Sequence, residues 1–476
     1  MIILGTNSIK DTGFDVANSC RFDDGSSAYM HKTPGSAGDQ QKFTFSFWIK
    51  RCALATGTAM TIFDTEADDD NQFKIRFNDN GTLTVESKVS DHNDSLITTQ
   101  LFRDPSAWSN FVIAFDTTQG TASNRVKIYH NGTQITSFGT ENYPAEDLNT
   151  LVNAANKLYV GTSAQTDAYC DMYIAEFCLV DGQQLAATSF GEFDEDSPRI
   201  WKPKDVSGLT FGTNGFYLDF EDSANLGNDA NGGTDLTEVN LAATDQTTDT
   251  PTNNFCTLNS LDGGQQDTTL SEGNLKIDAG GSASWGYNAG TFHVSSGKWF
   301  WEMKVLVDNP LFFGVVESEN TSFIHKANVY PYKNYGGFAV YSSSSQGQKQ
   351  EGTTDGRSTY QSSQSVNDIM GIALDLDNNR LYTSKNGQWS DGSGNNDEAS
   401  PNAFLDLSSN LSVTNPSGWR PIFSMDNNAD VSVNFGNPAF SISSGNSDAN
   451  GYGNFEYAPP SGYYALCTKN LAEYGG

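Results

Sequence analysis

Residues 368–389 constrain the fold more than any other stretch, because they contain two successive strand reversals. Apolar side chains alternate with polar or small ones over 372–376, the period-two pattern of a strand with one buried face. The Asp-Asn-Asn sequence at 377–379 tolerates left-handed backbone, which predicts a turn. Asn386 and Gly387 then supply the positive φ angles of a tight type I′ turn. Two hairpins so close together predict antiparallel β-structure.

The same order of features occurs earlier in the chain. An apolar strand over 110–115 ends on Asp116, a polar loop follows, and an alternating strand over 126–130 ends at Asn131 and Gly132. Further strands are predicted at 43–50, 60–63, 73–77, 83–89, 157–161 and 172–180. We therefore predict an all-β protein built from two tandem antiparallel β-sandwiches.

Composition agrees with a chain made of strands and turns. The 476 residues include 45 Gly and 14 Pro and are numerous enough for two or three domains, each with a core. The apolar runs are too short for a transmembrane helix, and the first residues lack the basic and apolar regions of a signal peptide. We expect no membrane insertion and no ordinary secretion.

The charge balance argues against polyanionic partners. Lys and Arg together number 27 against 58 Asp and Glu, a net charge of −31. A chain without a basic surface cannot neutralise phosphates, so we expect neither nucleic acid nor anionic membranes as partners. Solubility is the simpler explanation of this charge, and adaptation to salty surroundings is the alternative.

The cysteines predict no metal site. All six are irregularly spaced, and none lies in a Cys-x-x-Cys motif. The five His residues are too dispersed to complete a zinc ligand set. Cys178 alternates with apolar neighbours and is predicted to pack as a small buried side chain. Assembly in a reducing cytoplasm is the simplest interpretation.

Four segments of the first half carry a family resemblance. They are 43–50 (Phe-Thr-Phe-Ser-Phe-Trp-Ile-Lys), 108–112, the hairpin at 128–132, and 171–177 (Asp-Met-Tyr-Ile-Ala-Glu-Phe). In this order they resemble a laminin-G-like domain of the concanavalin A-like fold over about residues 15–225. The resemblance implies a first β-sandwich, which we place at 1–227, followed by a linker over 228–267 rich in Asn, Gly, Asp and Thr.

The second half resembles another family. Residues 297–305 (Gly-Lys-Trp-Phe-Trp-Glu-Met-Lys-Val), the hairpin with Ser-Lys-Asn-Gly at 384–387, and the closing Asn-Phe-Gly at 434–436 together resemble a SPRY domain. This resemblance implies a second sandwich at 268–440. The remaining residues, 441–476, contain a Pro-Pro pair and are expected to form an extended tail laid along that domain.

Segments at the end of the first domain, in the linker and in the tail resemble virion proteins of marine tailed phages. They include 190–192, 200–204, 212–220, 250–255 and the tail segment 457–466. The resemblance implies a virion structural protein that is exposed on the particle surface after assembly in the host cytoplasm. It also implies other virion proteins as partners and a homo-oligomer.

No segment predicts catalysis. Glu192, Asp194 and Glu195 imitate the start of a glycanase motif, but Pro198 and Arg199 follow where the third acid belongs. Solvated acids in a turn lack the rigid spacing and shifted pKa that general acid–base catalysis needs. Neither a nucleophile elbow nor a phosphate-binding loop is found, so we predict that the protein is not an enzyme.

Tyrosines are the predicted ligand-binding residues. Tyr330, Tyr332 and Tyr335 cluster between two strands, beside a Pro and an Asn, where loops of a rigid sandwich commonly bind ligands. Tyr360 is added as a weaker candidate. The alternative is that these rings pack against the first domain or a neighbouring subunit. Asp68 and Asp70 offer oxygen ligands for Ca²⁺, against the simpler interpretation of a solvated acidic loop.

Two functions remain open from the sequence. The first is a non-enzymatic tail fibre or adhesin component that binds a host cell-surface glycan or protein. The alternative is a capsid decoration or head-fibre protein with a purely structural role in assembly. No trimerising coiled coil or β-helix repeat is found, which weakens the fibre interpretation.

Overall fold

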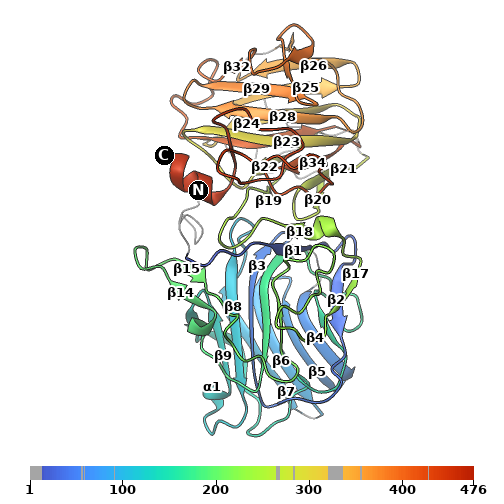
Figure 1. Ribbon diagram of the computed structural model, residues 1–476, viewed down its shortest axis with the longest axis vertical. Coiled ribbons are helices and arrows are strands. Elements are labelled where there is room, and N and C mark those ends of the chain that lie inside the picture. Colours follow the sequence, from blue (N-terminus) through green and yellow to red (C-terminus); the bar gives the residue numbers. More distant parts are fainter. Residues whose placement is uncertain are drawn as a thin grey trace. The chain divides into compact units, whose positions relative to one another are not determined.

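The computed structural model describes residues 13–54, 57, 59–90, 92–263, 268–281, 285–319, 336–353, 356–426 and 428–475. It divides into two compact units, one ending at Thr252 and one beginning at Asn253. Each unit contains two large antiparallel sheets, seen as arrows in Figure 1. The prediction of an all-β fold with tandem sandwiches is therefore confirmed. No helix among the described residues is long and apolar enough to cross a membrane.

The first sandwich has two sheets of eight strands each. Sheet I has the order β10 (Thr133–Ile135), β9 (Val126–His130), β8 (Ser109–Asp116), β3 (Lys42–Arg51), β13 (Met172–Asp181), β1 (Ser19–Phe22) and β18 (Gln246–Thr247), with β16 (Phe216–Leu218) beside β13. Sheet II has the order β11 (Phe138–Asn142), β7 (His92–Leu101), β6 (Thr82–Val89), β5 (Asn71–Phe77), β4 (Met60–Asp68), β12 (Leu158–Val160), β2 (Tyr29–Lys32) and β17 (Thr237–Val239).

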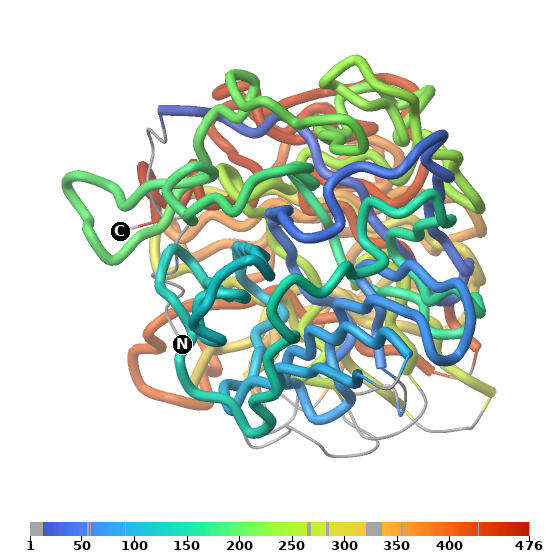
Figure 2. The backbone as a smooth tube through the Cα atoms, turned by 90° about the horizontal axis from the view of Figure 1, so that it is seen from below, coloured from blue at the N-terminus to red at the C-terminus, as the bar shows by residue number. Residues whose placement is uncertain are grey.

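The two sheets differ in what covers them. Residues of β3 and β13 are buried almost without exception, because the outer face of sheet I carries a second apolar layer. Trp201, Phe190 and Phe211 belong to this layer, and the segment that contributes them is green in Figure 2. Sheet II instead alternates buried apolar and half-buried polar residues along β5, so its outer face is polar.

The second sandwich is built in the same way. Sheet III has the order β19 (Leu258–Gly263), β22 (Gly286–Gly290), β33 (Trp419–Met425), β24 (Leu311–Glu317), β25 (Gly337–Ser343), β26 (Gln346–Glu351) and β27 (Ser358–Thr359). Sheet IV has the order β20 (Thr268–Ser271), β21 (Lys276–Ala279), β34 (Asp430–Asn434), β23 (Lys298–Val307), β28 (Ile369–Asp375), β29 (Arg380–Lys385), β30 (Gln388–Ser390) and β31 (Asn396–Glu398), with β32 (Leu405–Asp406) beside β29 and β35 (Tyr464–Ala465) beside β23.

The predicted hairpins are present. Strands β28 and β29 pair in register around 376–379, where Asn379 has a φ of 53°. Asn386 and Gly387 have φ angles of 50° and 79° between β29 and β30, as a type I′ turn requires. Asn131 and Gly132 repeat this turn at 46° and 75°.

The structure differs from the predicted linker. Residues 228–252 belong to the first sandwich, where β17 pairs with β2 and β18 with β1. Asp249 is buried there and accepts hydrogen bonds from Lys50 Nζ at 2.7 Å and Trp108 Nε1 at 2.9 Å. A segment of Asn, Gly, Asp and Thr resembles a linker in composition, but here its polar side chains bond inward.

The C-terminal tail packs on the second sandwich. Phe455 is buried against Phe300 of β23, with the ring centroids 5.1 Å apart. After the Pro-Pro pair, β35 runs parallel to β23, and the chain ends in a helix, α2 (Thr468–Tyr474). The extended conformation predicted for the tail therefore gives way to a terminal helix that the sequence analysis did not anticipate.

Candidate functional site

Of the four predicted tyrosines, only Tyr360 belongs to the residues that the structure describes. Tyr330, Tyr332 and Tyr335 lie outside the described residues. Tyr360 is 1% exposed, and its hydroxyl donates a hydrogen bond to the carbonyl of Ala403 at 2.8 Å. Its ring belongs to the core of the second sandwich and offers no surface to a ligand, which corrects the prediction for this residue.

The predicted calcium ligands lie in a turn between β4 and β5 that bonds itself. Asp68 Oδ1 accepts hydrogen bonds from the Asn71 side chain at 2.8 Å and the Asp70 backbone at 3.0 Å. The first of these bonds lowers the pKa of Asp68. Asp70 forms an ion pair with Lys88 at 2.9 Å. In the part of the chain that the structure describes, neither acid belongs to a group of three potential metal ligands.

A groove in the second sandwich is the strongest candidate binding site. Its cavity has a volume of about 600 Å³, within the range of small-ligand sites. One wall comes from the tail and the floor from the outer face of sheet IV; we call it the aromatic groove. Its lining comprises Phe300, Tyr382, Ser384, Gly387, Trp389, residues 399–401, residues 457–461 and Tyr463.

Strand register builds the floor of the groove. Phe300 of β23 lies opposite Ala373 of β28, which lies opposite Tyr382 of β29. The next outward-facing row runs through Gly371, Ser384 and Trp389. Because β28 contributes only Ala373 and Gly371 to these rows, the ring of Phe300 and the hydroxyl of Ser384 pack closely over Gly371 at the base of the groove. A Cβ atom at Gly371 would lie 2.4 Å from Ser384 Oγ, so this close packing depends on glycine there.

Glu302 fixes the tail wall of the groove. Its side chain is fully buried and accepts hydrogen bonds from the backbone N–H groups of Tyr457 at 2.7 Å and Glu456 at 3.0 Å. The side-chain amide of Asn434 donates a third bond at 3.1 Å. Burial raises the pKa of Glu302 to about 7 despite these donors. The carboxyl group thus holds Tyr457 in place at the groove.

The groove combines aromatic surface with polar groups. Besides its rings, it offers the hydroxyls of Ser384 and Ser461 and those of its tyrosines. Lys298 Nζ lies 5.8 Å from the ring centre of Tyr463, and Arg380 donates to the Tyr382 hydroxyl at 3.3 Å. Aromatic rings stack on apolar faces of a ligand, and hydroxyls bond to its polar edge. The lining has no cluster of like charges, so it suits an uncharged polar ligand.

An acid pair on sheet II was missed by the sequence analysis. Asp64 and Glu66 alternate on the outward face of β4, and Lys74 of β5 lies 3.7 Å and 3.2 Å from their carboxylates. Burial raises the pKa of Asp64 to about 7. Asp64 is nevertheless fully buried, and the backbone of Ala164 donates to it at 2.9 Å. A pair so covered presents no open face to a substrate, and we assign it a structural role.

The acids of the glycanase-like segment also have structural partners. Glu192 and Asp194 lie 3.6 Å and 3.4 Å from Lys202 Nζ. Asp194 additionally accepts hydrogen bonds from the backbone of Asp196 and Ser197. These contacts connect β14 (Gly191–Phe193) to β15 (Trp201–Pro203).

Comparison with known proteins identifies the first sandwich. The family model of the concanavalin A-like lectin/glucanases superfamily, Laminin_G_3, matches residues 24–186. This match confirms the predicted laminin-G-like, concanavalin A-like domain. No curated protein matches the sequence.

Solved structures similar to the chain include two SPRY domains, the family that residues 268–440 resemble. The SPRY domain of human HERC1 is 16% identical, with a TM-score of 0.28, and the match covers 37% of this chain and 96% of that one. The TRIM65 PSpry domain is 10% identical, with a TM-score of 0.27 and coverages of 38% and 91%. A heptameric SAP-like pentraxin from Limulus polyphemus is 13% identical, with a TM-score of 0.28 and coverages of 37% and 80%.

Proposed function

We propose that the protein is a non-enzymatic virion adhesin that binds a neutral glycan of the host surface in the aromatic groove. The observation that carries the binding function is the groove itself, a cavity of about 600 Å³. The half-buried Tyr457 offers ring surface to a ligand, and the buried residues Phe300, Tyr382, Trp389 and Tyr463 form the base. Sugar rings have an apolar face and a polar edge, and this lining matches both.

The preference for a neutral glycan follows from charge. The net charge of −31 repels acidic polysaccharides, and the groove itself contributes no compensating basic cluster. The location on a virion rests on the sequence resemblance of residues 190–254 and 457–466 to phage proteins. The tail segment of that resemblance supplies Tyr457 and the Pro-Pro pair of the groove wall.

Titration of the purified protein with a panel of neutral oligosaccharides tests the proposal. One or two stacked sugar rings correspond to a dissociation constant of about 0.1–1 mM. Tyr457→Ala removes a ring from the wall and should weaken binding about fivefold, since one aromatic contact contributes roughly 1 kcal/mol. Tyr341→Ala is the matched control, because Tyr341 lies half-buried on β25 of sheet III and outside the groove.

Three outcomes contradict the proposal. The first is the absence of binding to every oligosaccharide in the panel, and the second is equal affinity in Tyr457→Ala and wild type. The third is binding to virions stripped of this protein without binding to any glycan or host cell, which favours the structural role in assembly.

A further inference from the structure

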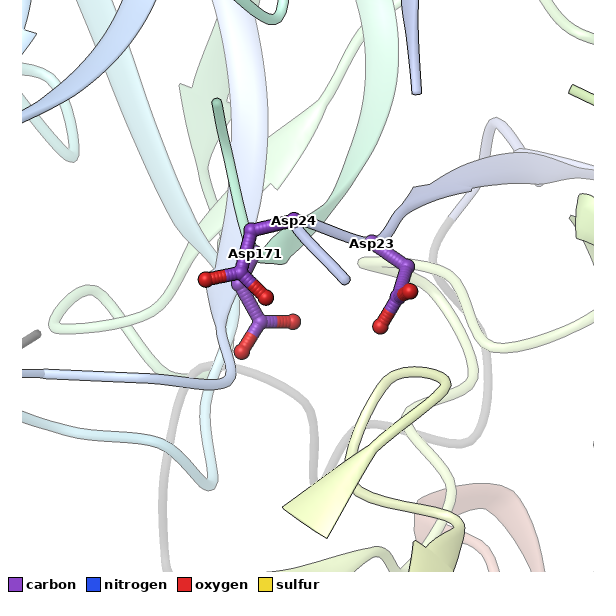
Figure 3. A group of neighbouring side chains, drawn as sticks. All are labelled: Asp23, Asp24 and Asp171. Atoms are coloured by element: carbon purple, nitrogen blue, oxygen red, sulfur yellow. The ribbon is translucent and has the colours of Figure 1, made fainter. Parts of the chain in front are cut away.

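Strand register brings three acids together at one end of sheet I. In the β1–β13 pair, Cys20 lies opposite Ile174 and Phe22 opposite Met172. The next position of this register places Asp23 opposite Asp171. Asp24 follows in the same turn, and one carboxylate oxygen from each of the three lies within 4.8 Å of the others (Figure 3).

These oxygens lie close enough together for one calcium ion to contact all three. Ca²⁺ binds oxygen at 2.3–2.6 Å, so two ligands on opposite sides of the ion are separated by about 4.8 Å. Mg²⁺ binds at about 2.0–2.1 Å in a stricter octahedron and keeps most of its waters. Three carboxylates supply only part of the six to eight oxygens that Ca²⁺ takes, and backbone carbonyls and water complete such sites.

A buried oxygen without a donor is an independent indication of a ligand. Asp171 is 4% exposed, and its Oδ1 has no hydrogen-bond partner among the described residues. Burial, followed by the charges of Asp24 and Asp23, raises the pKa of Asp171 well above its usual range. Buried carboxylate oxygens are normally bonded to a donor or a cation, because losing hydration without compensation is costly.

No side chain supplies the compensating charge. Among the described residues, Asp171 forms no ion pair, although Arg51 on the neighbouring β3 lowers its pKa slightly. The guanidinium of Arg51 donates to the carbonyl of Phe102 at 2.7 Å and to that of Ala53 at 3.3 Å. Like charges opposite each other in a sheet destabilise the pair, so the register of β1 and β13 itself favours a cation here.

We propose that Asp23, Asp24 and Asp171 form a calcium site that joins the end of β1 to the beginning of β13. The ion neutralises acids from two strands that lie far apart in the sequence and are neighbours in sheet I. It therefore stabilises the pairing of β1 with β13. This site is distinct from the Asp68 and Asp70 turn.

Calcium titration of the full chain after chelator treatment tests the proposal. Calorimetry should detect calcium binding, and the unfolding temperature of the first sandwich should rise by about 5–10 °C at 100 times the dissociation constant. The same concentration of Mg²⁺ should give a much smaller shift. Asp171→Asn should abolish both signals, and Asp24→Asn, at an exposed position, should weaken binding at least tenfold.

Asp68→Asn is the matched control, because it removes an exposed acid from the other acidic turn and should leave calcium binding unchanged. If wild type shows neither heat nor thermal shift with calcium, the proposal is wrong. Unchanged binding in a folded Asp24→Asn variant also overturns it, and this variant decides the matter if Asp171→Asn does not fold. Loss of binding in Asp68→Asn instead would assign the ion to the β4–β5 turn.

Discussion

Glu302 in the second sandwich and Asp171 in the first are both buried carboxyl groups on central strands or at their ends, yet their surroundings differ. Glu302 accepts bonds from three N–H donors, two of them in the backbone of the tail. Asp171 has one oxygen without a donor and two further acids beside it. The chain thus supplies donors to the Glu302 carboxyl group in one unit but leaves one oxygen of Asp171 without a donor in the other.

This difference separates two uses of a buried acid. Donors fixed by the chain make Glu302 an anchor, which positions the wall of the aromatic groove. Two neighbouring acids make the Asp171 site costly for the chain alone, because only a backbone hydrogen bond from Ala53 and the charge of Arg51 offset the lost hydration. Burial by itself therefore does not indicate a ligand. A missing donor indicates one only where further acids replace a cation: Asp64 Oδ1 also lacks a donor, but Lys74 lies 3.7 Å from that carboxylate.

The largest effect is expected when the anchor is removed. Glu302→Ala leaves three buried N–H donors unpaired and should destabilise the second sandwich by roughly 3–5 kcal/mol. Denaturant unfolding measures this loss, and limited proteolysis should cut the tail near Tyr457. Glu302→Gln keeps the side-chain volume and one acceptor, so it should lower the free energy of unfolding by less. If Glu302→Ala unfolds like wild type and keeps its tail protected, Glu302 is no anchor.

Stability should depend on pH through the buried acids of both units. Burial raises the pKa of Glu302 to about 7 and that of Glu176 on β13 to about 8. The folded state then holds protons that the unfolded state releases above about pH 4.5, so stability is greatest below that pH and decreases as pH rises through 7 and 8. The loss is on the order of 3–5 kcal/mol for each group.

Thermal unfolding followed between pH 4.5 and 8.5 measures this dependence. Glu302→Gln should flatten the slope for the second sandwich, and Glu176→Gln should flatten it for the first. A slope that rises with pH in wild type, or that neither variant changes, contradicts the assignment.

Local features of the fold could be predicted from the sequence because their causes are local. The Asn131-Gly132 and Asn386-Gly387 turns require positive φ angles at adjacent positions, and alternating residues mark β3 and β28. The predicted linker failed for the opposite reason. Its strands β17 and β18 are short, and their partners lie more than 200 residues away in the sequence.

The candidate sites depend on such distant pairing. The groove needs Phe300, Tyr382 and Tyr457 together, and only the register of sheet IV and the anchor at Glu302 bring them there. Asp68 and Asp70 were predicted as calcium ligands because they are neighbours in sequence. Acids so close in sequence instead accept hydrogen bonds within their own turn. Asp23 and Asp171 meet only when β1 pairs with β13.

The smallest effect is expected at the unsatisfied carboxyl group in the absence of calcium. Asp171→Asn removes a carboxyl group whose ionised form is disfavoured by burial and by two neighbouring acids, so the calcium-free variant should be as stable as wild type or more stable by about 1–2 kcal/mol. Denaturant unfolding in chelator measures this, with Glu302→Gln as the matched acid-to-amide change at the satisfied site. A loss of more than about 2 kcal/mol in Asp171→Asn would show that the chain already satisfies this carboxylate, and the contrast between the two units would disappear.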